Sequence, residues 1–164
     1  MRNLMLSALA GTLLGALSTA SAADKVSQVL IRDAIQDNLA EIQMGQLAQD
    51  KTQSSDVKSY GQMLVADHSA LNKQAEKVAE QIGIAVPTEL SSNQKAMYEK
   101  MSRLSGTEFD RAFIKEIIAD HKANIARLQN EAKKTNDPAA DFARQALPTL
   151  KKHLDAAQKL EHGT

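Results

Sequence analysis

The chain contains no cysteine and no tryptophan, and its 164 residues include three prolines and seven glycines. Without cysteine it cannot form disulfides, thiolate metal sites, c-type haem attachments or a cysteine nucleophile. Aromatic residues make up 3% of the chain, so its core must be built from Leu, Ile, Val, Ala and Met. Because helix-breaking residues are few and gather at segment boundaries, long helices are expected.

The chain also lacks an excess of charge, since 20 basic and 20 acidic residues give a formal net charge of zero. A near-neutral chain has no basic surface for nucleic acid or anionic lipid, and we expect neither as a partner. The sequence contains no phosphate-binding loop, nucleophile elbow, dinucleotide fingerprint or zinc-protease motif. It therefore indicates no catalytic residue and no organic cofactor.

The N-terminal segment 1–22 has the pattern of a secretory signal peptide. Arg2 supplies a positive start, an apolar run covers residues 4–17, and Ala20-Ser21-Ala22 resembles a cleavage site. We expect cleavage after Ala22 and a mature domain over residues 23–164, exported in a bacterium to the periplasm. The apolar run is shorter than the ~20 residues of a membrane span, and no later stretch reaches that length.

Apolar residues recur every three or four positions through most of the mature sequence, which predicts amphipathic helices. Long helices are expected over about Ser27–Lys51, Ser55–Ile82, Thr107–Ala132 and Pro138–Leu160, with a short helix over about Ser92–Leu104. Ser54 or Ser55, Thr107 and Asp137 are the expected N-caps, and Pro148 should bend the last helix. Two short connections and one long crossover predict an all-α antiparallel four-helix bundle with a short crossover helix.

Two of these helices carry near-copies of one phrase: residues 63–70 read MLVADHSA and residues 116–123 read EIIADHKA. In each copy the histidine, His68 or His121, falls on the apolar stripe of its helix. His153 occupies such a position on the last helix. An ionisable side chain among apolar neighbours needs a partner, and imidazoles on facing helices are ligands for Fe, Mn, Zn or Cu. We therefore expect the three histidines to meet inside the bundle, where they could hold one transition-metal ion.

Three carboxylates accompany the histidines. Glu41 lies on the shoulder of the first helix's apolar face, among small residues, and is the candidate fourth ligand. Asp67 and Asp120 point about 100° away from the histidines that follow them. Each is expected to bond the ring N–H of the histidine on the opposing helix, which fixes a tautomer, or to ligate the ion directly. A metal-free interpretation also stands, in which each histidine bonds a neighbouring carboxylate as a buried polar cross-link.

At these residues the chain resembles the bacterial exported family known as domain of unknown function 4142, which has a ferritin-like fold. The resemblance covers essentially the whole mature chain and rests on residues 41–48, 63–68, 106–110, 120–121 and 147–154. It implies a ferritin-like antiparallel four-helix bundle, secretion, and metal binding through Glu41, His68, His121 and His153, without an established activity. Ferritin-like di-iron proteins place a glutamate three residues before the histidine, where this chain has Val65 and Ile118. A single ion with histidine-rich ligation, or no ion, is therefore expected instead.

Two functions are consistent with the sequence. The first is an exported ferritin-like bundle that binds a transition metal in its core for metal handling or stress defence. The second is a metal-free periplasmic interaction or chaperone-like protein, whose partner would be an envelope protein or a second copy of the chain. An enzyme that used the metal would need an open coordination position, which sequence does not reveal.

Overall fold

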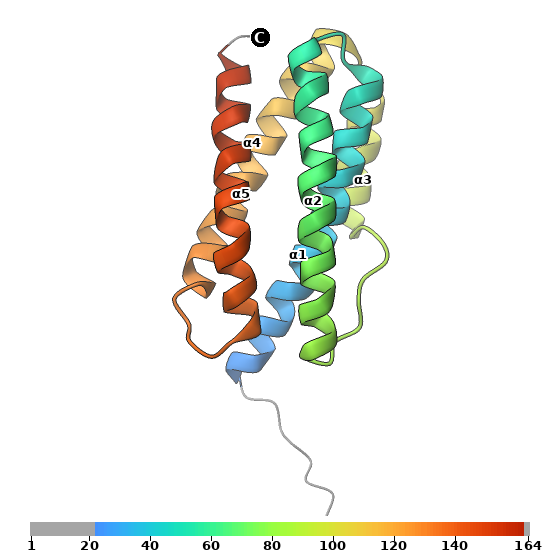
Figure 1. Ribbon diagram of the computed structural model, residues 1–164. Helices are drawn as coiled ribbons and strands as arrows, with labels where there is room; N and C mark the ends of the chain where they lie inside the picture. The colour runs from blue at the N-terminus through green and yellow to red at the C-terminus, as the bar shows by residue number, and fades with distance from the viewer. Residues whose placement is uncertain (1–21, 163–164) are drawn as a thin grey trace, which may run out of the picture.

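The computed structural model describes residues 22–162 and shows five α-helices and no strand over that range (Figure 1). The helices are α1 (Ala22–Lys51), α2 (Ser55–Gln81), α3 (Ser92–Ser102), α4 (Gly106–Glu131) and α5 (Pro138–Glu161). The predicted all-α fold of four long helices and one short crossover helix is confirmed. The expected signal peptide lies outside the described residues, apart from Ala22. None of the described helices is long and apolar enough to cross a membrane.

Neighbouring long helices run in opposite directions. In Figure 1, α1 and α5 run upward and α2 and α4 run downward, as the colour gradient shows. Short connections join α1 to α2 and α4 to α5, so the fold consists of two helical hairpins. The segment 82–105 carries the chain back along the bundle between them, and its helix α3 packs against α1 and α4.

Side-chain caps mark several helix starts, and those at Ser54 and Asp137 were predicted. Ser54 accepts a hydrogen bond from the first turn of α2, and Ser91 caps α3 in a capping box. Asp137 caps α5, with Pro138 as its first residue. These side chains satisfy backbone N–H groups that have no partner inside the helix.

Two helix starts differ from the prediction. α1 reaches back to Ala22 rather than beginning near Ser27, because no glycine or proline interrupts the segment between them. The prediction that Thr107 caps α4 is wrong. Gly106, with φ of +56°, is already the first helical residue, and Ser105 precedes it without a side-chain cap bond. α5 continues through Pro148 to Glu161.

Two apolar clusters fill the two halves of the bundle. One contains Ile35, Leu71, Ile125 and Leu150, and the other contains Leu47, Leu64, Ile117 and Ala157. On every long helix, buried polar residues lie between the two clusters along the chain: Asn38 and Glu41 on α1, His68 on α2, His121 on α4 and His153 on α5. A polar layer therefore crosses the middle of the core. Burying such groups costs free energy unless each finds a partner, so the layer is where a function should be sought.

Candidate metal centre

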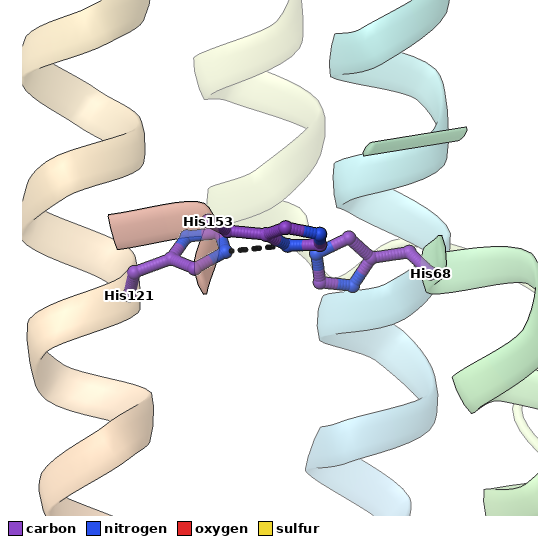
Figure 2. Close-up of side chains that lie close together, drawn as sticks. All are labelled: His68, His121 and His153. Atoms are coloured by element: carbon purple, nitrogen blue, oxygen red, sulfur yellow. Dashed lines mark hydrogen bonds between the residues drawn. The ribbon is translucent and has the colours of Figure 1, made fainter. Parts of the chain in front are cut away.

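The three stripe histidines come together in the middle of the bundle (Figure 2). Their ring centroids lie 5.6 Å apart for His68 and His121, 5.1 Å for His68 and His153, and 5.4 Å for His121 and His153. Their exposed fractions are 3%, 1% and 0%, respectively. The prediction that histidines from three separate helices converge inside the bundle is confirmed, and we call these residues the histidine cluster.

One nitrogen of each ring can take part in a common site. One ligand atom from each of the three rings lies within 4.8 Å of the other two. Nε2 of His121 lies 3.3 Å from Nδ1 of His153. Two nitrogens bound to one zinc ion at a tetrahedral angle would be about 3.4 Å apart, since Zn–N bonds measure about 2.1 Å. This pair is thus already at the spacing that a bound ion requires.

The other nitrogen of each ring, which we call the outer nitrogen, lies beside a hydrogen-bond acceptor outside the cluster. Nδ1 of His121 lies 3.0 Å from the carbonyl oxygen of Ile117, and Nε2 of His153 lies 2.9 Å from Oδ2 of Asp67. Nδ1 of His68 lies 2.9 Å from Oδ1 of Asn38. Carbonyl, amide and carboxylate oxygens accept hydrogen bonds, so the hydrogen in each contact belongs to the ring nitrogen.

These outer bonds determine what the centre of the cluster presents. A neutral imidazole carries one N–H, so a ring that donates outward turns a lone pair inward. Nε2 of His68, Nε2 of His121 and Nδ1 of His153 therefore all face the cluster as acceptors. Nε2 of His68 has no hydrogen-bond partner among the described residues. Figure 2 marks the 3.3 Å contact between Nε2 of His121 and Nδ1 of His153 as a hydrogen bond, but with both outer bonds made neither nitrogen carries the hydrogen that this bond needs. The inward lone pairs then repel one another, and a cation would relieve that repulsion.

The three rings are not protonated at neutral pH, so a proton does not serve as this cation. Burial, followed by the neighbouring His121 and His153, holds the pKa of His68 well below its usual value. Burial lowers the pKa of His121 to about 4, with His153 adding to the effect. Burial also lowers the pKa of His153, although Asp67 partly opposes the shift. The rings are neutral, which is the form that binds a metal ion.

Asp67 has the position expected of a residue that orients a ligand. It projects from α2 toward α5, where its Oδ2 lies 2.9 Å from Nε2 of His153, a histidine of another helix but not the one in the second copy of the phrase. Its burial raises its carboxyl pKa, but hydrogen bonds from His153 and Lys152 outweigh this and hold the pKa below its usual value. Asp67 is therefore ionised at neutral pH and accepts the His153 N–H.

Glu41 and Asp120 lie on a different side of His121. Oε1 of Glu41 is 3.5 Å from Nδ1 of His121, the outer nitrogen, and not beside the three inward lone pairs. Burial, then repulsion from Asp120, Asp37 and Glu116, raises the pKa of Glu41 well above its usual value. Asp120 makes no hydrogen bond to a histidine among the described residues, and it lines a pocket together with Glu41. Ligation of the histidine-bound ion by either carboxylate stays a prediction.

Sequence reasoning missed two groups that hold the cluster. Asn38 of α1 bonds His68, and its place on the apolar stripe, three residues after Ile35 and four before Ile42, was a usable signal. Tyr60 of α2 is buried and donates its hydroxyl hydrogen to the backbone oxygen of His153 over 3.0 Å. The first bond orients the ring of His68, and the second ties α2 to the backbone of α5 at His153.

Space for a further ligand exists next to the cluster. A cavity of about 30 Å³ is lined by His68, Asn38, Leu71 and Leu150, among others. That volume accommodates about one water molecule. Of the histidine cluster, His68 alone lines this cavity, so a water molecule there would lie beside that ring and its partner Asn38.

Comparison with known proteins identifies the family but no characterised relative. Neither the curated proteins nor the solved structures gave a significant match. The family described as "Domain of unknown function (DUF4142)" matches residues 14–160, which include all four long helices apart from the last residue of α5. The chain therefore belongs to the family of proteins with the domain of unknown function DUF4142.

Proposed function

We propose that this protein binds one transition-metal ion in its core through His68, His121 and His153. One observation carries the proposal: one nitrogen of each ring lies 2.9 or 3.0 Å from an acceptor outside the cluster, and one ligand atom of each ring lies within 4.8 Å of the other two. Rings that donate outward in this way turn lone pairs toward a shared centre. A set of structural cross-links would leave hydrogen-bond donors and acceptors paired, whereas Nε2 of His68 has no partner among the described residues. The arrangement supports a site built for a cation.

The donor set favours particular metals. Neutral imidazole suits Zn, Cu and Fe better than Mn, which favours oxygen ligands, and a chain without cysteine offers no thiolate to select soft ions. For nitrogen ligands of this kind, affinity among divalent ions rises toward copper, with zinc following it. The positions three residues before His68 and His121 hold Val65 and Ile118 rather than glutamate, which favours a single ion over a carboxylate-bridged pair.

The setting of the site favours retention of metal over rapid turnover of a substrate. Its three ligands come from three helices, and none of them is more than 3% exposed. An ion in such a position can leave only when the bundle opens locally. We infer a role in metal handling or stress defence outside the cytoplasm, and the pattern of Arg2, the apolar run 4–17 and Ala20-Ser21-Ala22 supports the export step.

Metal analysis tests the proposal directly. The full chain is expressed with export in a bacterium, purified from the periplasm without chelator, and its metal content measured by elemental mass spectrometry. We expect about one transition-metal ion per chain, and mass spectrometry should find Ala23 as the first residue. The variant His68→Asn, which keeps a polar side chain at this position, should lose the ion, whereas His162→Ala removes an exposed histidine and should keep it.

Two negative results together would reject this function, and the first is the absence of stoichiometric metal in the purified protein. The second criterion is a thermal-shift assay of the metal-free protein with Zn²⁺, Cu²⁺, Fe²⁺ and Mn²⁺. If no ion is present after purification and none raises the unfolding temperature more in the wild type than in His68→Asn, the histidines act as a structural network. The interaction or chaperone-like function would then be the better account.

A further inference from the structure

A second site lies outside the histidine cluster, on the side of His121 that carries its outer nitrogen. A pocket of about 380 Å³ opens between α1, α3 and α4. Its lining includes four carboxylates: Asp37 and Glu41 from α1, and Glu116 and Asp120 from α4. We call it the acidic pocket.

The basic side chain that lines the acidic pocket already forms ion pairs with two aspartates. Arg127 is the one basic residue among those that line it. Its guanidinium donates to Asp33 over 2.9 Å and to Asp37 over 2.8 Å. None of the salt bridges between described residues reaches Glu116 or Asp120, and the single contact of Glu41 is with the neutral ring of His121. Three carboxylates therefore share the pocket without a basic partner.

Glu41 supplies an independent sign that the pocket is made for a ligand. Its exposed fraction is 5%, and it lines the pocket. Its Oε2 atom is buried and has no hydrogen-bond partner among the described residues. A carboxylate oxygen in this state carries a desolvation cost that a bound cation would offset.

The arrangement on α4 is also unfavourable without a cation. Glu116 and Asp120 are four residues apart and so lie on the same face of the helix. Like charges at this spacing destabilise a helix. A divalent ion bound by both carboxylates would offset this repulsion, because each carboxylate is attracted to the ion.

We propose that the acidic pocket binds a hydrated divalent cation through Glu41, Glu116 and Asp120. Carboxylate oxygens and water are the ligands of Mn²⁺, Mg²⁺ and Ca²⁺, whereas the histidine cluster offers nitrogen alone. A water molecule occupies about 30 Å³ of liquid, so the pocket holds an ion together with much of its hydration shell. The site is distinct from the histidine cluster and takes a harder ion.

Binding of Mn²⁺ to the full exported chain tests this site. The protein is first loaded with one equivalent of Zn²⁺, and free Mn²⁺ is then followed by electron paramagnetic resonance during titration. We expect about one bound Mn²⁺ per chain. The double variant Glu41→Gln with Asp120→Asn should weaken Mn²⁺ binding at least tenfold. The control double variant Asp50→Asn with Glu108→Gln changes two exposed carboxylates of α1 and α4 and should bind as the wild type does.

Two outcomes would overturn the proposal: no Mn²⁺ binding to the wild type at millimolar concentration, or equal affinity in the wild type and the Glu41/Asp120 variant. If that variant does not fold, Glu116→Gln replaces it, since this side chain is half-buried, and it too should weaken binding. His68→Asn separates the two sites, because His68 does not line the acidic pocket. It should abolish Zn²⁺ binding and retain Mn²⁺ binding, so failure of the metal function proposed for the histidines remains distinguishable from failure here.

Discussion

Asp67 on α2 accepts a hydrogen bond from Nε2 of His153 on α5, over 2.9 Å, and so determines which nitrogen of that ring faces the histidine cluster. The two residues are 86 positions apart in the chain. Asp67 is about one-third exposed, whereas His153 is fully buried. The carboxylate therefore reaches in from the edge of the bundle and orients a histidine in its core.

Removing this carboxylate should weaken metal binding. We expect Asp67→Ala to lower Zn²⁺ affinity about 10- to 100-fold, the usual effect of losing a partner that orients a histidine ligand. Asp67→Asn keeps an acceptor oxygen and should recover part of the loss. Competition titration with a chromophoric chelator measures both. Asp155→Ala removes an exposed aspartate from the helix that carries His153 and should leave affinity unchanged.

The tautomers of the three rings can be observed without adding metal. Because each outer nitrogen donates to a fixed acceptor, long-range ¹H–¹⁵N spectra of the metal-free protein should show hydrogen on Nδ1 of His68, Nδ1 of His121 and Nε2 of His153. Asn38→Ala removes the acceptor at His68, so the hydrogen of that ring should no longer favour Nδ1, while the other two rings should be unchanged. Spectra in which an inner nitrogen of the wild type carries the hydrogen would contradict the inward lone pairs.

Acid should destabilise the metal-free protein. The pKa of His121 falls from 6.5 to about 4 on folding, and those of His68 and His153 are lowered too. The unfolded chain then binds more protons than the folded one between about pH 6.5 and 4. Stability is complete above pH 6.5 and is lost as the pH falls through this window, by on the order of 3 kcal/mol for His121 alone. Urea unfolding in chelator across this range measures the loss.

Carboxyl groups with raised pKa act in the opposite direction. The pKa of Asp120 rises to about 6 through burial and repulsion from Glu116 and Asp37, and that of Glu41 is also raised. These groups take up protons more readily in the folded protein, so they favour folding as the pH falls. In Glu41→Gln with Asp120→Asn this compensation is gone, and the loss of stability below pH 6.5 should be steeper. A profile that is flat in both proteins would show that the histidines are not buried as neutral rings.

The crossing of α1 and α2 depends on two glycines. A Cβ atom added at Gly45 would lie 2.7 Å from the carbonyl oxygen of Gly61, and one added at Gly61 would lie 2.7 Å from that of Gly45. Backbone atoms cannot rotate away, so either Ala substitution must move a helix. We expect Gly45→Ala and Gly61→Ala each to lower the free energy of unfolding by about 1–3 kcal/mol, despite the better helix propensity of alanine.

A glycine without close neighbours provides the control for this crossing. Gly83 has φ of +70° and open space around its Cα, so Gly83→Asn should have a small effect, because asparagine tolerates this conformation. Equilibrium denaturation of the three variants makes the comparison. Wild-type stability in both Gly45→Ala and Gly61→Ala would show that the helices do not approach so closely.

The sequence by itself determined the helices and the burial of the histidines. Apolar residues at helical spacing on either side of His68, such as Leu64 and Leu71, place it on an inner face, and Asp137-Pro138 marks the start of α5. These are local properties, since a residue's neighbours three and four positions away establish which face of the helix is buried. The prediction that the three histidines meet required, in addition, the antiparallel bundle expected from the order of the helices.

Only the tertiary structure decided how the polar layer is divided. It directs the inner nitrogens of the histidines to one centre, and it places Glu41 beside the outer nitrogen of His121 and in the acidic pocket with Asp120. Helical periodicity gives the angle at which a side chain leaves its own helix, but not which side chain of another helix it meets. That depends on how the helices cross and on contacts such as the one between Asp67 and His153, which no local spacing contains.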